Sequence, residues 1–150
     1  MQKYSILLIV IPILLGCTNN NFSNNNPYIP NYNFTVEIDL GNASNSQLSS
    51  FPNALYYPYE GVRGIFIICS GIEEYKSFDA ACPNQALSSC STMSFKKINP
   101  VDPLKIDKTT VVCSCDNAEY SLFTGQSPGK QYPLKQYRVE VNGSLLRVYN

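Results

Sequence analysis

The chain has 150 residues, with 11 basic and 11 acidic side chains, six cysteines and no histidine. Its length is typical of one domain, and its formal net charge of zero argues against nucleic-acid binding, which needs clustered Lys and Arg. The absence of histidine excludes Ser-His-Asp and Cys-His catalysis, His-bound zinc and imidazole acid–base chemistry near pH 7. No other acid–base or nucleophile constellation is visible, so we do not expect an enzyme.

Residues 1–16 have the layout of a bacterial lipoprotein signal peptide. Lys3 provides a positive charge, and an apolar run follows from Ile6 to Leu15. Such a run is too short for a bilayer span, which needs about 20 residues. The ending LLGC at residues 14–17 resembles a lipobox, which implies cleavage before Cys17 and lipidation of its thiol. An ordinary signal peptide that ends near a cysteine is the alternative.

A lipid on Cys17 implies a protein of the bacterial cell envelope, anchored outside the cytoplasm on a periplasmic or surface face. The next residues, 18–33, read TNNNFSNNNPYIPNYN and are poor in aliphatic side chains and charge. Such a composition buries too little apolar surface to offset chain entropy. We therefore predict a flexible tether over residues 17–33, with an ordered N-terminal extension as the alternative, and a folded domain over residues 34–150.

The domain sequence predicts many short strands. Residues 34–40 alternate between apolar and polar side chains, and residues 61–69 form a β-branched apolar run. Further strands are expected at residues 74–78, 109–113, 118–123, 137–141 and 145–149, with Asn142-Gly143 as a hairpin turn before the last. No long window has helical spacing free of Gly and Pro. The prediction is an all-β fold of antiparallel sheets, a sandwich or small barrel.

Five cysteines remain if Cys17 is lipidated: Cys69, Cys82, Cys90, Cys113 and Cys115. Outside the cytoplasm, disulfides can persist. The odd number leaves at least one thiol unpaired or otherwise used. Alternatively, four thiolates could hold zinc or an iron–sulfur cluster, although the spacing does not match the C-x₂-C pattern of zinc ribbons.

From about residue 61 to residue 148, the chain resembles the Rieske [2Fe–2S] domain family. The resemblance is carried by Phe78-Asp79 before Cys82, by CSCDNAEY at residues 113–120, by the TG and PL pairs at residues 124–125 and 133–134, and by the closing hairpin at 137–148. It implies a Rieske-like fold with two cysteine-bearing loops. Rieske proteins transfer single electrons through a cluster held by two Cys and two His.

The resemblance fails at the metal ligands. By position, Cys82 and Cys113 correspond to the cysteine ligands, whereas Asn84 and Asp116 stand where the family has histidine. Neither residue is an imidazole donor, so the standard coordination is impossible in this chain. The signal peptide also lacks arginine, whereas family members exported with a cluster are expected to travel folded by a twin-arginine route.

The resemblance also implies disulfide pairings. Some Rieske proteins brace the two cluster loops with a disulfide, and its positions match Cys90 and Cys115. In the family fold the two cysteine ligands bind one iron, so Cys82 and Cys113 would be close enough to form a second bridge in its absence. Cys69 would then remain as a buried thiol. Thiol–disulfide exchange at residues 113–115 is a further alternative, although no C-x-x-C at a helix start supports it.

We therefore predict an envelope lipoprotein whose Rieske-like domain lacks the standard cluster. It would act as a non-catalytic binding or assembly module, with an envelope protein as partner and no cofactor. The alternative is an electron-transfer protein that binds a [2Fe–2S] cluster with non-standard ligands, drawn from Cys82, Cys90, Cys113 and Cys115.

Overall fold

The computed structural model describes residues 25–99, 101–102 and 104–150. The predicted signal peptide, Cys17 and residues 18–24 lie outside this range. Nine strands and one short 3-10 helix make up the regular structure of the described part, and all strand pairs are antiparallel. The predicted all-β class is therefore confirmed. In the described part, no helix is long and apolar enough to cross a membrane.

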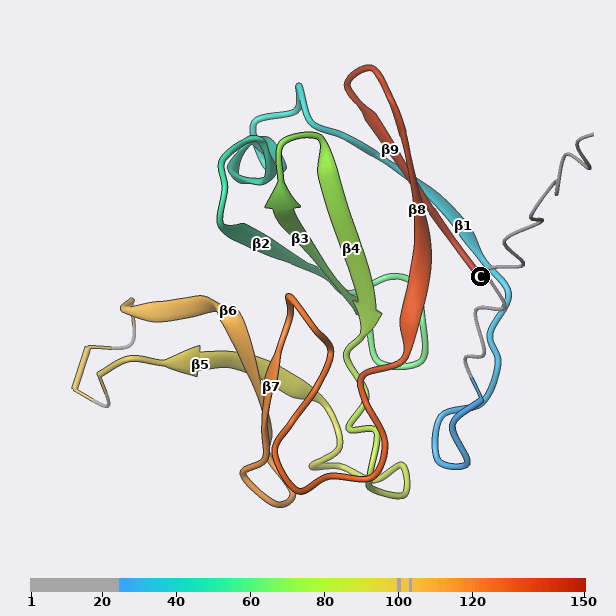
Figure 1. The fold of residues 1–150 in the computed structure, drawn as a ribbon, viewed down its shortest axis with the longest axis vertical. Coiled ribbons are helices and arrows are strands. Elements are labelled where there is room, and N and C mark those ends of the chain that lie inside the picture. The colour runs from blue at the N-terminus through green and yellow to red at the C-terminus, as the bar shows by residue number, and fades with distance from the viewer. Residues whose placement is uncertain (1–24, 100, 103) are drawn as a thin grey trace, which may run out of the picture.

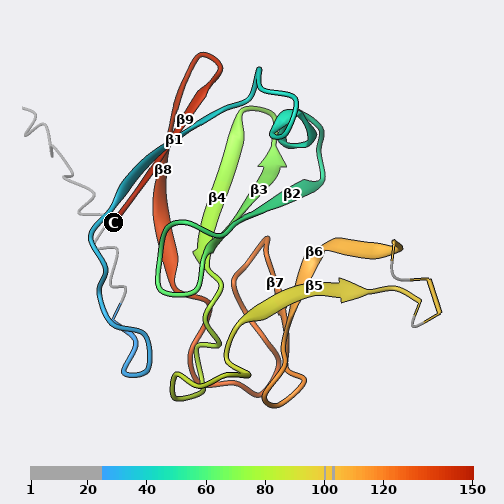
Figure 2. The same ribbon diagram turned by 180° about the vertical axis from the view of Figure 1, so that it is seen from behind.

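Six strands form the larger sheet, in the order β1-β9-β8-β4-β3-β2. Their bounds are β1 (Thr35–Asp39), β2 (Asn53–Tyr57), β3 (Ile65–Gly71), β4 (Glu74–Asp79), β8 (Gln136–Asn142) and β9 (Leu145–Tyr149); the 3-10 helix η1 is Ser46–Ser49. The smaller sheet has the order β5-β6-β7, with β5 (Met93–Lys97), β6 (Ile106–Cys113) and β7 (Glu119–Ser121). Figures 1 and 2 show the smaller sheet below the larger one, with long loops at the lower end.

Strand β3 is apolar throughout because both of its faces are covered. Phe66 and Ile68 belong to the core between the two sheets, whereas Ile65 and Ile67 belong to a second core under β1, β8, β9 and η1. All four side chains are at most 1% exposed. A strand buried on both faces is expected to have a continuous apolar sequence rather than an alternating one.

Several predicted boundaries differ from the structure. The strand predicted from residue 61 begins at Ile65, because Gly61 and Gly64 have positive φ angles of 78° and 90° and form a turn. The β8–β9 hairpin turns at Gly143-Ser144, one residue later than predicted, and Asn142 is paired with Leu145.

Strands β2 and β5 were not predicted from the sequence. Each has only one buried residue, Ala54 in β2 and Met93 in β5. Their sequences therefore lack the alternation that identifies a half-buried strand. Both strands pair with a longer and more apolar neighbour, β2 with β3 and β5 with β6.

The predicted tether is wrong for its last residues. Ile29 is 1% exposed, and the Asn26 side chain donates a hydrogen bond to the Pro83 carbonyl at 2.8 Å. The buried Lys135 ammonium donates to Asn31 Oδ1 at 2.7 Å. Residues 26–31 therefore pack on the domain and belong to it. Their Asn-rich composition concealed this, because a single aliphatic side chain and a few polar contacts secure the segment.

A buried carboxylate positions the first cysteine-bearing loop, residues 80–92 between β4 and β5. Asp79, at the end of β4, accepts hydrogen bonds from the Val62 N–H at 2.6 Å, the Ala81 N–H at 2.7 Å and the Tyr137 hydroxyl at 2.6 Å. Burial raises the pKa of this carboxyl, while the hydrogen bonds oppose the rise. Asp79 thus joins the turn before β3, strand β8 and the start of the loop.

Substitution of Gly64 by Ala should destabilise the fold strongly. The new Cβ would lie 2.6 Å from the Tyr56 ring at a φ of +90°, so both a clash and backbone strain are added. We expect a loss of about 2–4 kcal/mol in the free energy of unfolding, measured by urea titration.

Gly129→Ala is the matched control. Gly129 has a similar positive φ of +72°, but no atom lies within 4 Å of the position that a Cβ would take there. This variant should lose only about 1 kcal/mol in the free energy of unfolding, from placing a non-glycine residue at positive φ. Equal losses in the two variants would contradict the role of the Tyr56 contact.

Candidate functional site

Two disulfides join the two cysteine-bearing loops. The first loop, residues 80–92, connects β4 to β5. The second, residues 114–118 taken together with Cys113 at the end of β6, leads from β6 to β7. Cys82 is bonded to Cys113, with a Cα–Cα distance of 5.6 Å, and Cys90 to Cys115, with a Cα–Cα distance of 5.0 Å. These are the pairings implied by the resemblance. Cys69 is a free thiol and is buried.

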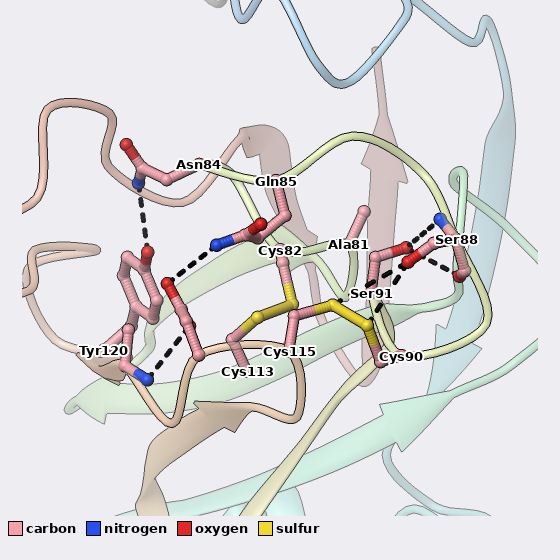
Figure 3. The surroundings of a disulfide bond; sticks show 12 residues. Ala81, Cys82, Asn84, Gln85, Ser88, Cys90, Ser91, Cys113, Cys115 and Tyr120 are labelled. Carbon is pink, nitrogen blue, oxygen red and sulfur yellow. Dashed lines mark hydrogen bonds between the residues drawn. A yellow bond between two sulfur atoms is a disulfide. The ribbon is translucent and has the colours of Figure 1, made fainter.

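The two bridges differ in exposure. Cys82 and Cys113 are fully buried and belong to the core between the sheets, and we call their disulfide the inner bridge. Cys90 is exposed and Cys115 is half-buried, and their disulfide is the outer bridge. Figure 3 shows the two bridges next to each other. Solvent therefore reaches one disulfide of the pair and not the other.

Backbone hydrogen bonds fix the loops at the inner bridge. The Cys82 N–H donates to the Ser91 carbonyl at 2.8 Å, which closes the first loop on itself. In the second loop, the Asn117 N–H donates to the Cys113 carbonyl at 2.9 Å, and Asn117 adopts a φ of 57°. Asn tolerates this left-handed conformation better than most residues. The tight turn directs Cys113 and Cys115 toward the first loop.

Asn84, at the first expected histidine position, links the first loop to a third one. Its Nδ2 donates to the Tyr120 hydroxyl at 3.0 Å and to the Tyr132 carbonyl at 2.7 Å, and its Oδ1 accepts from the Tyr132 N–H at 3.0 Å. Figure 3 shows the contact with Tyr120. Both N–H donors and the oxygen of the amide thus bridge the first loop to β7 and to residues 122–135, the third loop, which connects β7 to β8.

Asp116, at the second expected histidine position, forms an ion pair. Lys130 Nζ lies 2.6 Å from its Oδ2, Gln85 Nε2 donates to the same oxygen at 3.0 Å, and the Ala118 N–H donates to Oδ1 at 3.1 Å. Partial burial opposes ionisation of this carboxyl, but the hydrogen bond from Lys130 and the other donors hold its pKa below the ordinary value.

The third loop was not identified as part of the site from the sequence. Lys130 and Tyr132 lie on it, and they contact Asp116 and Asn84, respectively. The only signal in the sequence was the family-like TG and PL pairs, which lie within this loop on either side of Lys130 and Tyr132. A lone lysine after glycine has no pattern that indicates an ion pair with a residue 14 positions earlier.

The residues at the site do not fit a standard Rieske cluster. The chain has no imidazole, and the Asn84 amide and the Asp116 carboxylate are already bonded to neighbouring side chains and backbone. The Cys82 and Cys113 sulfurs are bonded to each other. The Sγ atoms of Cys82, Cys113 and Cys115 do lie within 4.8 Å of one another, so three sulfurs are grouped closely.

Comparisons with known proteins give only a coarse likeness. No family model matches the chain, and no curated protein does. A ferredoxin of carbazole 1,9a-dioxygenase from Nocardioides aromaticivorans IC177 is 13% identical, with a TM-score of 0.43 over 75% of this chain and 96% of that one. A complex of reduced oxygenase and oxidized ferredoxin in carbazole 1,9a-dioxygenase gives 14% identity and a TM-score of 0.46, over 77% of this chain and 92% of that one.

A structure described as "the putative nitrite reductase NADPH (small subunit) oxidoreductase protein" is 18% identical, with a TM-score of 0.42 over 77% of this chain and 97% of that one. These values describe a rough similarity of chain path, and they assign no activity to this chain.

Replacement of Asn84 by Ala should destabilise the domain by about 1–3 kcal/mol, because the Tyr132 N–H and the buried Tyr120 hydroxyl lose their partner. Urea unfolding measures this. Gln131→Ala is the control, since Gln131 is exposed and its side chain donates a hydrogen bond to the hydroxyl of the adjacent Tyr132; its effect should stay within about 0.5 kcal/mol. An Asn84 variant as stable as this control would contradict the bridging role.

The Asp116 ion pair should give a specific pH dependence. Because the folded-state pKa of Asp116 is lowered, its contribution is present above the unfolded-state value of about 3.9 and is lost as the pH falls through the folded-state pKa. The difference in unfolding free energy between wild type and Asp116→Asn should therefore shrink as the pH falls from about 5 toward 2. A difference that grows on acidification would contradict the ion pair.

Proposed function

We propose that the chain is a lipid-anchored module of the bacterial cell envelope, with a Rieske-like domain that works without a cofactor as a binding or assembly domain. The observation that carries the proposal is the state of the four positions that the resemblance aligns with cluster ligands. Cys82 and Cys113 are joined to each other, while Asn84 and Asp116 are hydrogen-bonded within the loops.

The inner bridge takes over the mechanical role that a cluster has between two loops. It joins cysteines 31 positions apart, and a disulfide that closes a loop of this size typically stabilises a domain by about 3–4 kcal/mol. The outer bridge joins the same loops a second time. With two disulfides between the same loops, the domain can keep the arrangement of these loops without iron.

The polar groups around the loops support a non-catalytic role. The Lys130 ammonium and the Asp116 carboxylate form an ion pair, and the Asn84 amide does not ionise near neutral pH, so it cannot act as a general acid or base. What the three loops offer is a surface whose segments are joined by two disulfides and by hydrogen bonds between loops. We infer that this surface contacts an envelope protein, with the lipid on Cys17 holding the domain at a membrane.

An electron-transfer function is the alternative, and one observation favours it. The Sγ atoms of Cys82, Cys113 and Cys115 lie within 4.8 Å of one another, and Cys90 is bonded to Cys115. With both bridges reduced, four thiolates would be available for a [2Fe–2S] cluster, whose potential would be low compared with a Rieske centre.

Iron analysis of the mature protein, purified without oxygen, tests the proposal. We expect no stoichiometric iron, no visible absorption from a cluster, and one free thiol per chain under denaturing conditions, from Cys69. Cys82→Ser should leave the iron content unchanged at background. Iron near two atoms per chain in the wild type, lost in Cys82→Ser, would overturn the cofactor-free function in favour of electron transfer.

A further inference from the structure

The inner bridge is sealed from solvent, yet a neighbouring sulfur is within reach of it. Cys82 and Cys113 are both 0% exposed, so a reductant in solution cannot contact them in the folded domain. Cys115 Sγ, which belongs to the outer bridge, lies within 4.8 Å of both inner sulfurs. Exchange between disulfides requires a thiolate that can approach a disulfide sulfur. Cys115 is placed to do so once its own disulfide has been reduced.

We propose that the two bridges form a thiol–disulfide relay, in which a dithiol reduces the outer bridge and the released Cys115 thiolate then opens the inner one. The substrate class is a dithiol, either a protein or a small molecule. The relay rests on the cofactor-free function, because it needs Cys82 and Cys113 to be bonded to each other.

The first step takes place at Cys90, the exposed member of the outer bridge. A thiolate of the dithiol attacks Cys90 Sγ and forms a mixed disulfide, and the Cys90–Cys115 bond breaks with Cys115 leaving as a thiolate. The second thiol of the dithiol then attacks the other sulfur of the same molecule, which is bonded to Cys90 in the mixed disulfide. The bond between that sulfur and Cys90 Sγ breaks. The dithiol departs as a disulfide, having lost two electrons, and Cys90 is left as a thiol.

The second step is internal and moves no electrons in or out of the chain. The Cys115 thiolate attacks Cys82 Sγ, a Cys82–Cys115 bond forms, and Cys113 leaves as a thiolate that takes up a proton. Attack on Cys82 keeps the two loops joined. Attack on Cys113 would instead form a disulfide between two cysteines separated by a single residue, and it would leave the loops without a bridge. The remaining disulfide now includes the half-buried Cys115, where a second dithiol can reduce it.

Ser88 is placed to assist the first step. Its Oγ lies 3.3 Å from Cys90 Sγ and 3.8 Å from Cys115 Sγ, so its hydroxyl can donate a hydrogen bond to a sulfur that gains negative charge. The Ser88 carbonyl accepts a hydrogen bond from Arg63 Nη2 at 3.0 Å, which places a positive charge on the same loop. Hydrogen bonds and positive charge both favour the thiolate form.

The relay is tested with two matched variants of the mature chain, Cys90→Ala and Cys115→Ala, without reductant. Each keeps the inner bridge and frees one cysteine of the outer one. In Cys90→Ala the free Cys115 should exchange, so that trapping of thiols under acidic denaturing conditions and peptide mapping find part of the free thiol at Cys113. In Cys115→Ala the free thiol should stay at Cys90, apart from Cys69.

A kinetic measurement with dithiothreitol complements the mapping. Opening of the Cys82–Cys113 bond should be at least about tenfold slower in Cys115→Ala than in the wild type and in Cys90→Ala, because the attacking thiolate is missing. Urea unfolding of each variant verifies that the domain is folded. Equal rates in the two variants, with the free thiol of Cys90→Ala found only at Cys115, would overturn the relay.

The wild-type disulfide map separates this outcome from failure of the proposed function. A wild type that contains both bridges while Cys90→Ala shows no exchange would eliminate the relay alone. A wild type that binds iron and lacks the inner bridge would eliminate both proposals.

Discussion

The buried disulfide between Cys82 and Cys113 is the constraint on which the arrangement of the loops depends. It lies in the core between the two sheets, packed with side chains such as Phe78 and Tyr120, and it joins the end of β6 to the loop that follows β4. Because apolar side chains bury it, this disulfide belongs to the hydrophobic core and is not a cross-link at the surface. The outer bridge, Asn84 and Asp116 then hold the loops around it.

Buried polar contacts join the larger sheet to the loop that carries Cys82. Those of Asp79 are the clearest, because one carboxylate is shared by the turn before β3, the first cysteine-bearing loop and Tyr137 on β8. Its burial raises its own pKa, so the fold accepts an electrostatic cost at this point. In return, the turn before β3, strand β8 and the start of the loop that carries Cys82 are fixed with respect to one another.

The sequence predicted those parts of the fold that depend on strong local patterns. The alternating strand at residues 34–40, the apolar run of β3 and the closing hairpin could all be placed within a few residues, because their side chains face a core. Strands β2 and β5 could not, since each buries one residue and owes its form to pairing. The resemblance singled out Asn84 and Asp116 from the sequence, but Lys130 could not be found in that way, because an ion pair between two loops leaves no periodic signal.

The packing of residues 26–31 on the domain alters the mechanics of the proposed membrane anchor. Ile29 is buried and Asn26 is bonded to Pro83, next to Cys82 of the inner bridge. Only residues 18–25 therefore separate Cys17 from the segment that packs on the domain, about half the number in the predicted tether. Fewer than ten residues can extend over at most about 30 Å. With a lipid on Cys17, as proposed, the domain would be kept close to the bilayer surface, and its attachment would lie near the cysteine-bearing loops.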